Sequence, residues 1–393
     1  MSRVRLSTSL EECRGESFSL IIFLVFIMAE NTKIENQGTI DTAPTEEKFM
    51  VRALELAKLG MGQVAPNPLV GCVIVHEGLI IGEGYHHKHG EAHAEVNAIR
   101  SVKNQDLLSK STMYVTLEPC SHFGKTPPCA DLVVRMKIPK VVVGSMDPNK
   151  KVAGKGLECL KNGGCEVETG LLEEECNRMN RRFLTVHLKK RPYIILKWAQ
   201  TEDGFIDRSR VEEEFGQPTW ITNDLSRIAV HKMRSDEAAI LVGTKTALKD
   251  NPSLTVREWS GNHPLRMVLD RRGILPEGTA LLDQSTETLV FTGKAMVSKH
   301  NLEYVRIHFN KDMLKEINTI LIRRGVQSLL VEGGKSLLES YLRDGIWDEA
   351  RIYIGNKRFG SGIKAPETDW ILDREEALDD SLMRIYYRNE KQD

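Results

Sequence analysis

A histidine, a glutamate and two cysteines are the residues of this chain best suited to metal chemistry. His93 and Glu95 stand in the tripeptide H-A-E, Cys120 follows a glutamate and a proline, and Cys129 comes nine residues later. A catalytic zinc ion takes three protein ligands and keeps a fourth position open, and His93, Cys120 and Cys129 would supply those ligands. Zinc lowers the pKa of its bound water toward 7, so these residues predict a hydrolytic site.

Glu95 is two residues from His93 and is expected to carry protons without binding the metal. H-x-E with P-C-x-x-C marks zinc nucleobase deaminases, although here eight residues rather than two separate the cysteines. Two unrelated packing cysteines are the alternative, but their order after H-A-E favours zinc. We do not expect the histidines of H-H-K-H, residues 86–89, to bind metal. Four other cysteines are expected to be packing residues: Cys72, Cys159, Cys165 and Cys176.

Short strands and helices must position these side chains. His93 and Glu95 are expected at the start of a helix, Cys120 after a strand, and Cys129 at the start of another helix. Strand and helix patterns alternate, which predicts a layered α/β domain. The expected strands are residues 70–75, 79–81, 113–117 and 141–144, and the expected helices are 46–60, 91–99 and 130–136.

A second alternation follows the segment K-K-R-P-Y at residues 189–193. We therefore expect a leader at residues 1–45, one α/β domain at 46–190 and another at 191–393. The expected strands of the second domain are 194–198, 239–243, 265–270, 289–292 and 328–331, and its expected helices are 226–234, 313–323 and 336–343.

Two glycine-containing strand ends predict a phosphate site in the second half. V-G-T-K-T at residues 242–246 and V-E-G-G-K-S at 331–336 each end a predicted strand. Backbone N–H groups can approach phosphate at such positions, although each could also be an ordinary turn. G-x-G-x-x-G is not found after a strand and before a helix, so a conventional dinucleotide-binding domain is not predicted.

Three longer strings together resemble the bifunctional riboflavin-biosynthesis deaminase–reductase family. They are P-N-P-L-V-G at residues 66–71, T-L-E-P-C-S-H-F-G-K-T-P-P-C at 116–129, and V-G-T-K-T-A-L-K-D-N-P-S-L-T-V-R at 242–257. The similarity extends from about residue 48 to near the C-terminus. It implies a cytidine-deaminase-like three-layer α/β/α domain, a dihydrofolate-reductase-like α/β domain, and Zn2+ and NADPH as cofactors.

The resemblance also implies two successive reactions on a small phosphorylated pyrimidine. In the first, 2,5-diamino-6-(ribosylamino)-4(3H)-pyrimidinone 5′-phosphate loses ammonia by zinc-dependent hydrolysis, with Glu95 moving the protons. In the second, NADPH reduces the ribosyl chain to give 5-amino-6-(ribitylamino)uracil 5′-phosphate. Asp203 is a candidate proton donor for this second step by its location only.

Site residues follow from the same resemblance. Arginines among the implied substrate contacts suit the substrate phosphate. Two alternatives stay open: Asp147 and Asn149 could form a simple turn, and Trp220 could be a core aromatic. The implied deaminase substrate contacts are Asn67, Lys125, Asp147 and Asn149. The implied NADPH contacts are Ala199, Trp220, Thr246, Asp250, Gly334, Lys335 and Ser336, and the implied reductase substrate contacts are Arg234, Leu254, Arg257 and Glu332.

The chain departs from the family pattern in one loop. Pro218 stands two residues before Trp220, where the family often has a serine. The segment between Asp203 and Trp220 also looks lengthened and contains an acidic insert. We expect its E-E-E run at 212–214 to be a solvated loop face, and contacts from this loop do not follow from the resemblance.

Composition narrows the class of protein. The 393 residues are 41% hydrophobic and 28% charged, which excludes a disordered or collagen-like chain. Lys plus Arg is 54 and Asp plus Glu is 55, so the protein as a whole does not attract nucleic acid or anionic membranes. This balance counts against the alternative function, a zinc deaminase acting on nucleic acid with a C-terminal recognition domain. Without a fourth zinc ligand, a non-catalytic, zinc-stabilised interaction protein is also disfavoured.

Seven cysteines are an odd number and argue against a secreted disulfide scaffold. We expect a cytoplasmic enzyme that binds neither nucleic acid nor membrane and forms a homo-oligomer. The apolar run at residues 18–29 is too short to span a bilayer and resembles the core of an export signal. Because no A-x-A site follows it, we expect translation to start at Met28, with an export or anchor signal as the alternative. Residues 30–45 are polar and expected to be disordered.

Overall fold

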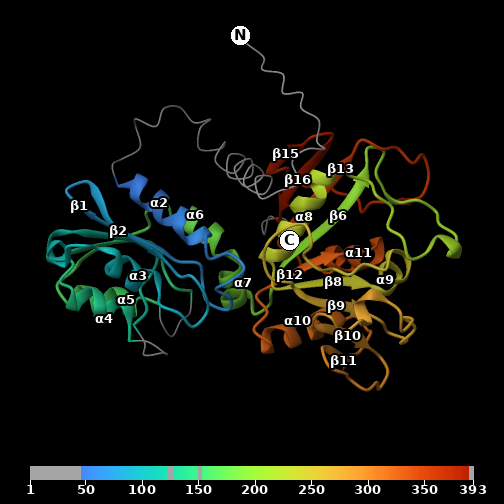
Figure 1. Cartoon of the computed structure of the whole chain (residues 1–393), viewed down its shortest axis with the longest axis horizontal. Helices are drawn as coiled ribbons and strands as arrows, with labels where there is room; N and C mark the ends of the chain where they lie inside the picture. The colour runs from blue at the N-terminus through green and yellow to red at the C-terminus, as the bar shows by residue number, and fades with distance from the viewer. Residues whose placement is uncertain (1–45, 122–126, 149–152, 389–393) are drawn as a thin grey trace, which may run out of the picture. The chain divides into compact units, whose positions relative to one another are not determined.

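The structure is a computed structural model, which describes residues 46–121, 127–148 and 153–388 (Figure 1). Several predictions lie outside these residues: the apolar run at 18–29, the start at Met28 and the disorder of 30–45. Among the described residues, no helix is long and apolar enough to cross a bilayer.

Five strands form the first sheet, in the order β2-β1-β3-β4-β5. Strand β1 pairs antiparallel with β2 and β3, whereas β3, β4 and β5 run parallel. The strands are β1 (Gly71–His76), β2 (Leu79–Tyr85), β3 (Thr112–Leu117), β4 (Lys140–Ser145) and β5 (Glu166–Thr169).

Helices cover both faces of this sheet, because successive strand residues point to opposite sides. Cys72 and Ile74 of β1 belong to the core beneath three helices, and Val73 and Val75 to the core beneath two others. The first group is α3 (Ala94–Ser101), α4 (Cys129–Arg135) and α5 (Lys155–Asn162), and the second is α2 (Glu47–Lys58) and α6 (Glu173–Met179). This is the three-layer α/β/α fold that the resemblance implied.

Nine strands form the second sheet, in the order β11-β10-β9-β8-β12-β6-β13-β16-β15. The strands from β11 to β13 in this order run parallel, and β16 and β15 are antiparallel additions. The strands are β6 (Tyr193–Thr201), β8 (Ala239–Gly243), β9 (Leu265–Leu269), β10 (Thr288–Thr292), β11 (Leu302–Arg306), β12 (Ser328–Glu332), β13 (Glu349–Gly355), β15 (Arg374–Leu378) and β16 (Ser381–Tyr387).

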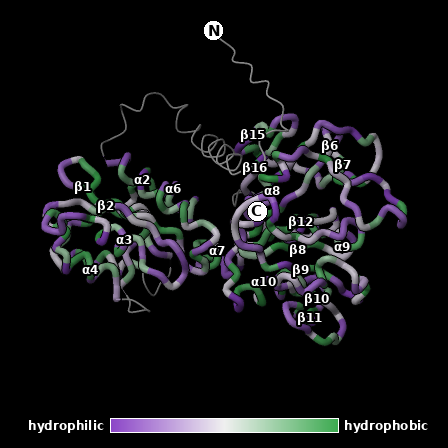
Figure 2. The backbone as a smooth tube through the Cα atoms, in the orientation of Figure 1, coloured by the Kyte–Doolittle hydropathy of each residue, from purple (hydrophilic) through white to green (hydrophobic). Residues whose placement is uncertain are grey.

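The parallel strands of the second sheet are buried on both sides, as parallel sheets generally are. Leu241 and Leu329 pack with α10 (Met313–Arg323) and α11 (Lys335–Arg343) on one face. Ile240 and Leu330 pack on the other face with residues of α8 (Asp224–Asp236) and α9 (Thr244–Asp250). Figure 2 shows hydrophobic and hydrophilic residues alternating along helices such as α2 and α10, as expected of helices with one buried face.

Most predicted elements agree with the structure to within a few residues. Three boundaries differ by three residues or more. α3 begins at Ala94 rather than at residue 91, because residues 91–93 form the irregular segment that leads into it, and β2 and β6 extend to Tyr85 and Thr201 rather than to residues 81 and 198. The remaining helix before the second sheet is α7 (Arg181–Lys189). Of the four predicted packing cysteines, Cys159 is only half-buried and donates its thiol hydrogen to Asp131. The E-E-E run is largely exposed, as predicted.

Candidate active sites

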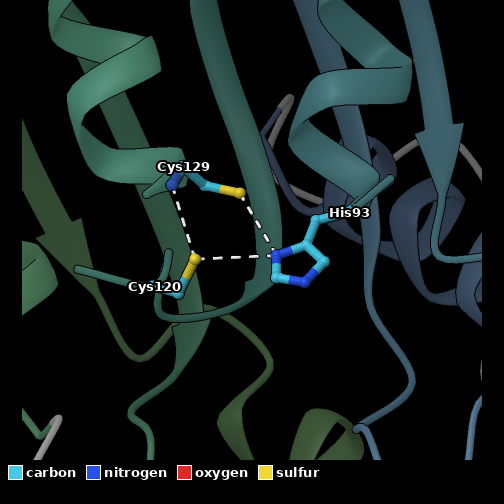
Figure 3. A group of neighbouring side chains, drawn as sticks. All are labelled: His93, Cys120 and Cys129. Atoms are coloured by element: carbon cyan, nitrogen blue, oxygen red, sulfur yellow. Dashed lines mark hydrogen bonds between the residues drawn. The ribbon is translucent and has the colours of Figure 1, made fainter. Parts of the chain in front are cut away.

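The three predicted metal ligands lie together (Figure 3). His93 Nδ1, Cys120 Sγ and Cys129 Sγ are within 4.8 Å of one another. The sulfur atoms of Cys120 and Cys129 lie 3.6 and 3.3 Å from that nitrogen. Zinc bonds of about 2.0 Å to nitrogen and about 2.3 Å to sulfur place tetrahedral ligands about 3.5 Å apart. Both the donor types and their spacing therefore fit a zinc ion.

Each of these ligands stands where an element begins or ends. His93 directly precedes α3, Cys120 follows β3, and Cys129 is the first residue of α4. The backbone N–H of Cys129 donates to Cys120 Sγ at 3.4 Å. Hydrogen bonds from Cys129 and His93 lower the pKa of the Cys120 thiol to about 4, which favours the thiolate that binds metal. Among the described residues, the cluster includes none of the histidines at 86, 87 and 89.

Glu95 is the second residue of α3, and its side chain is buried beside the cluster. Burial, and then the charge of Cys120, raise the pKa of its carboxyl to about 7. A carboxyl group with a pKa near 7 can both accept and release a proton at neutral pH. The position and the pKa of Glu95 suit a proton carrier.

His86 connects Asn67 to this centre. Its Nδ1 lies 3.1 Å from the carbonyl oxygen of Ala92, and its Nε2 lies 3.1 Å from Asn67 Nδ2. Because a carbonyl only accepts, Nδ1 must donate, and Nε2 then accepts from the Asn67 amide. This leaves Asn67 Oδ1 available to a ligand donor. The His86 ring lies edge-on to that of His93, with 5.4 Å between the ring centroids. This link between Asn67 and His93 was not predicted, because His86 was considered only as a metal ligand.

The buried carboxylate of Glu118 accepts three backbone hydrogen bonds. They come from the N–H groups of Asp147 at 3.2 Å, Gly154 at 3.1 Å and Gly156 at 2.9 Å. A Cβ on Gly156 would lie 2.0 Å from the Pro119 carbonyl oxygen, so only glycine allows this approach. Glu118 thus ties the strand end that carries Cys120 to the segment after β4. This role of Glu118 was not predicted from the sequence.

Of the predicted deaminase substrate contacts, Asn67 and Asp147 are half-buried in the described residues. Lys125 and Asn149 lie outside the described residues.

A cavity of about 1670 Å³ lies at the carboxyl ends of β6, β8 and β12 in the second sheet. In open α/β sheets this edge is where ligands bind. All eleven residues predicted for the second site line it: Ala199, Trp220, Arg234, Thr246, Asp250, Leu254, Arg257, Glu332, Gly334, Lys335 and Ser336.

β8 ends at Gly243, and Gly333 and Gly334 follow the end of the neighbouring strand β12. The N–H of Gly334 donates to Thr246 Oγ1 at 2.8 Å, and a Cβ on Gly334 would lie only 3.3 Å from that oxygen. Gly243 and Gly333 line the same wall. Glycines at these strand ends allow a ligand to approach the backbone closely, and Lys335 and Ser336 line the cavity beside them, so the residues present fit the pyrophosphate of NADPH.

A buried ion-pair group forms another part of the cavity. Arg234 donates two hydrogen bonds of 2.9 Å to Glu332, and Lys197 Nζ lies 3.5 Å from the same carboxylate. Burial opposes the ionisation of Glu332, but Arg234 and Lys197 lower its pKa to about 2. Because Arg234 is already paired, Arg257, which is exposed, is better placed for a phosphate. Lys197 was not predicted as a site residue, although a lysine within an apolar strand pattern was a usable signal.

Three further predictions can be compared with the structure. Trp220 is 54% exposed, so it is not a core aromatic. Leu254 is buried with φ of 55°, a left-handed conformation that is uncommon for leucine and occurs at ligand sites. Asp203 does not line the cavity and accepts hydrogen bonds from Thr201 and from the N–H of Gly360. Its suggested role as a proton donor therefore stays a prediction that this geometry does not support.

Two family models match the chain. The cytidine and deoxycytidylate deaminase zinc-binding region matches residues 43–145, and the RibD C-terminal domain matches residues 192–369. The riboflavin biosynthesis protein RibD of Aquifex aeolicus is 40% identical over 327 residues, which cover 81% of this chain and 89% of the relative. RibD of Escherichia coli strain K12 is 36% identical over 338 residues, which cover 81% of this chain and 90% of the relative.

Solved structures agree with these matches. A Thermotoga maritima diaminohydroxyphosphoribosylaminopyrimidine deaminase/5-amino-6-(5-phosphoribosylamino)uracil reductase has a TM-score of 0.79 and 38% identity, covering 87% of this chain and 98% of its own. Acinetobacter baumannii RibD has a TM-score of 0.78 and 32% identity, covering 88% of this chain and 99% of its own. The chain therefore belongs to the RibD family of bifunctional riboflavin-biosynthesis enzymes, which join a zinc-dependent deaminase to an NADPH-dependent reductase.

Proposed function

We propose that this chain converts 2,5-diamino-6-(ribosylamino)-4(3H)-pyrimidinone 5′-phosphate to 5-amino-6-(ribitylamino)uracil 5′-phosphate in two steps. In the first, water supplies the oxygen that replaces the ring amino group, and ammonia leaves. In the second, a hydride from NADPH and a proton reduce the ribosyl chain to ribityl. The name of the Thermotoga maritima relative supports these substrates, because it states both activities.

The grouping of His93, Cys120 and Cys129 beside Glu95 carries the deaminase assignment. When bound, zinc supplies a water molecule whose pKa is lowered toward 7. Glu95 takes one proton from the water and passes it to the ring nitrogen, and it then takes the second from the added hydroxyl group and passes it to the departing amine. Asn67 Oδ1, oriented through His86, accepts a hydrogen bond from the pyrimidine, and Asp147, Lys125 and Asn149 complete the proposed contacts.

The cavity of the second sheet carries the reductase assignment. The Gly334 wall holds the cofactor pyrophosphate, and Arg257 binds the substrate phosphate. Arg234, Leu254 and Glu332 form the rest of the substrate contacts, and Lys197 delivers the proton. The proposed cofactor contacts are Ala199, Trp220, Thr246, Asp250, Gly334, Lys335 and Ser336.

We propose that residues 46–190 carry the first activity and residues 191–393 the second. The strands of the two sheets fall on either side of this boundary, which supports it. The six cysteines in the described part of the chain are free thiols, which supports a reducing, cytoplasmic location. The balance of charges supports a small substrate over nucleic acid or membrane, and we retain the homo-oligomer as an expectation.

Substitution of Glu95 by glutamine tests the deaminase site. Glu95→Gln keeps the size of the side chain and leaves the three ligands intact, so zinc content measured by elemental analysis should not change. Ammonia release should fall by about 10²–10⁴-fold, because the proton carrier is lost. NADPH oxidation with the deaminated intermediate serves as the control and should stay at the wild-type rate. Full deaminase activity in this variant would remove Glu95 from its role.

A further inference from the structure

The lengthened loop between β7 (Phe205–Asp207) and α8 forms part of the second cavity. Arg210 lies in this loop, and only 3% of its side chain is exposed. Phe215, Pro218 and Trp220 from the same loop also line the cavity. Residues of this loop therefore form one wall of the second cavity. Contacts from this loop did not follow from the family resemblance.

Arg210 fastens this wall to α9 through both ends of its guanidinium group. Nη2 lies 3.0 Å from Asp207 Oδ2 and 2.5 Å from Asp250 Oδ1. Nη1 donates to the carbonyl oxygens of Gln217 at 2.7 Å and Lys249 at 3.2 Å. The planar guanidinium group is suited to holding several acceptors in fixed directions, which the ammonium group of lysine cannot do.

Arg210 also lies between two neighbouring carboxylates. Asp207 and Asp250 both lie against Arg210, and Lys249 Nζ lies 3.5 Å from Asp207 Oδ2. Burial raises the pKa of Asp250, and the hydrogen bond from Arg210 opposes that rise. Without Arg210, two partly buried carboxylates would lose a shared cation, and the direction of the Asp250 carboxylate would no longer be fixed.

We propose that Arg210 is a positioning residue for the reductase cofactor, which orients the Asp250 carboxylate and holds the loop wall that bears Trp220. This inference rests on the proposed function, since it takes NADPH as the ligand of the cavity. Both Asp250 and Trp220 are proposed cofactor contacts, so one side chain organises two of them. Arg210 acts through these residues and takes no part in hydride transfer.

The test is calorimetric titration of NADPH and NADP+ into the zinc-loaded full chain. Arg210→Leu should weaken binding by about tenfold or more, because it removes the cation that Asp207 and Asp250 share. Arg210→Lys keeps the charge but loses the planar donor arrangement, so its affinity for NADPH should lie between that of wild type and that of Arg210→Leu. The matched control is Arg208→Leu in the same loop, whose side chain is 55% exposed and pairs with Glu214. It should bind within about twofold of wild type.

Three outcomes decide the proposal. If wild type binds neither nucleotide, the proposed reductase function fails, and the inference fails with it. If wild type binds but Arg210→Leu matches Arg208→Leu, the positioning role is overturned while the reductase function stands. Should the second domain of Arg210→Leu not fold, shown by loss of its cooperative transition in urea unfolding, Arg210→Lys decides, and wild-type affinity in that variant overturns the proposal.

A double substitution separates action through Asp250 from a general loosening of the protein. In an Asp250→Asn background, Arg210→Leu should weaken NADPH binding less than it does alone. An equal loss in both backgrounds would contradict action through Asp250. Deaminase turnover of each variant should remain at the wild-type level.

Discussion

Lys197 is a largely buried cation that lines the second cavity. It lies on β6 with Nζ 3.5 Å from Glu332, and burial lowers its pKa despite this neighbour. A lysine with a lowered pKa releases its proton more readily than a solvated one. Its position and its pKa make Lys197 the group best suited to deliver the proton that accompanies hydride transfer.

Replacement of Lys197 by methionine tests this role. Lys197→Met keeps an unbranched side chain but removes the ammonium group. We expect kcat for NADPH oxidation, with the deaminated intermediate as substrate, to fall by about 10²-fold or more. The dissociation constant for NADPH should change little, and the deaminase rate provides the internal control. A kcat within about twofold of wild type would exclude Lys197 as the proton donor.

The metal ligands could be predicted from the sequence, but the side chains that act through residues far away in the sequence could not. His93, Cys120 and Cys129 were predictable because zinc demands few ligand types in a recognisable order. Glu118 and Arg210 were not, because their roles depend on partners up to 38 and 40 residues away. Such contacts are created by the fold and leave no local pattern.

At the scale of elements, the metal centre depends on how the end of β3 is held. Glu118 joins that end to the segment after β4 and to the first residues of α5. Because Asp147 lies two residues after the end of β4, the same carboxylate relates a metal ligand to a proposed substrate contact. The three hydrogen bonds make this connection rigid.

Glu118→Gln should loosen the connection without removing a metal ligand. An amide has one accepting oxygen in place of two, so its NH2 group would face a backbone N–H. We expect a loss of stability of about 1–3 kcal/mol, measured by urea unfolding, and a higher KM for deamination with zinc content unchanged. The matched control is Glu158→Gln, an exposed residue of α5. A KM equal to that of the control would show that Glu118 does not act through the Asp147 segment.

Element prediction succeeded where hydrophobic patterns were strong and was incomplete elsewhere. β8 and α10 have the predicted bounds, because both carry clear apolar patterns. The elements that were not predicted include the strands β5, β11, β13, β15 and β16 and the helices α5, α6, α7 and α9. β15 alternates between half-buried and exposed residues and contains three charged side chains in succession, so its pattern is close to that of a loop.

At the scale of the whole molecule, one buried histidine makes stability depend on pH. His231 of α8 accepts a hydrogen bond from the backbone N–H of Arg257 at 3.0 Å. Burial, Arg234 and Arg257 lower its pKa from 6.5 to about 4, while Glu258 and Glu332 oppose this shift. Between these values the unfolded chain binds a proton that the folded protein does not, so stability falls as the pH falls from 6.5 toward 4.

The expected loss from His231 is on the order of 3 kcal/mol at pH 4. His231→Asn can keep an acceptor near the Arg257 N–H but cannot titrate, so its stability should fall less between pH 7 and pH 5. Urea unfolding at both pH values measures the difference. The same substitution at the exposed His300 is the control. An equal pH dependence in wild type and His231→Asn would contradict the assignment.

The match of the RibD C-terminal domain to residues 192–369 also decides between the functions considered from the sequence. The alternative function, a zinc deaminase acting on nucleic acid, required a C-terminal recognition domain. Residues 192–369 match a reductase domain instead. The interaction protein without catalysis is excluded by the same membership of a bifunctional enzyme family.

The most direct test of the account supplies the diaminopyrimidine ribotide and NADPH to the zinc-loaded protein and follows ammonia and NADPH together. We predict that ammonia appears first, that NADPH oxidation follows after a lag, and that one NADPH is consumed for each ammonia released. Protein stripped of zinc should do neither, yet should oxidise NADPH when given the deaminated intermediate. Oxidation of NADPH by the diaminopyrimidine ribotide without release of ammonia would contradict the proposed order and the separation of the two sites.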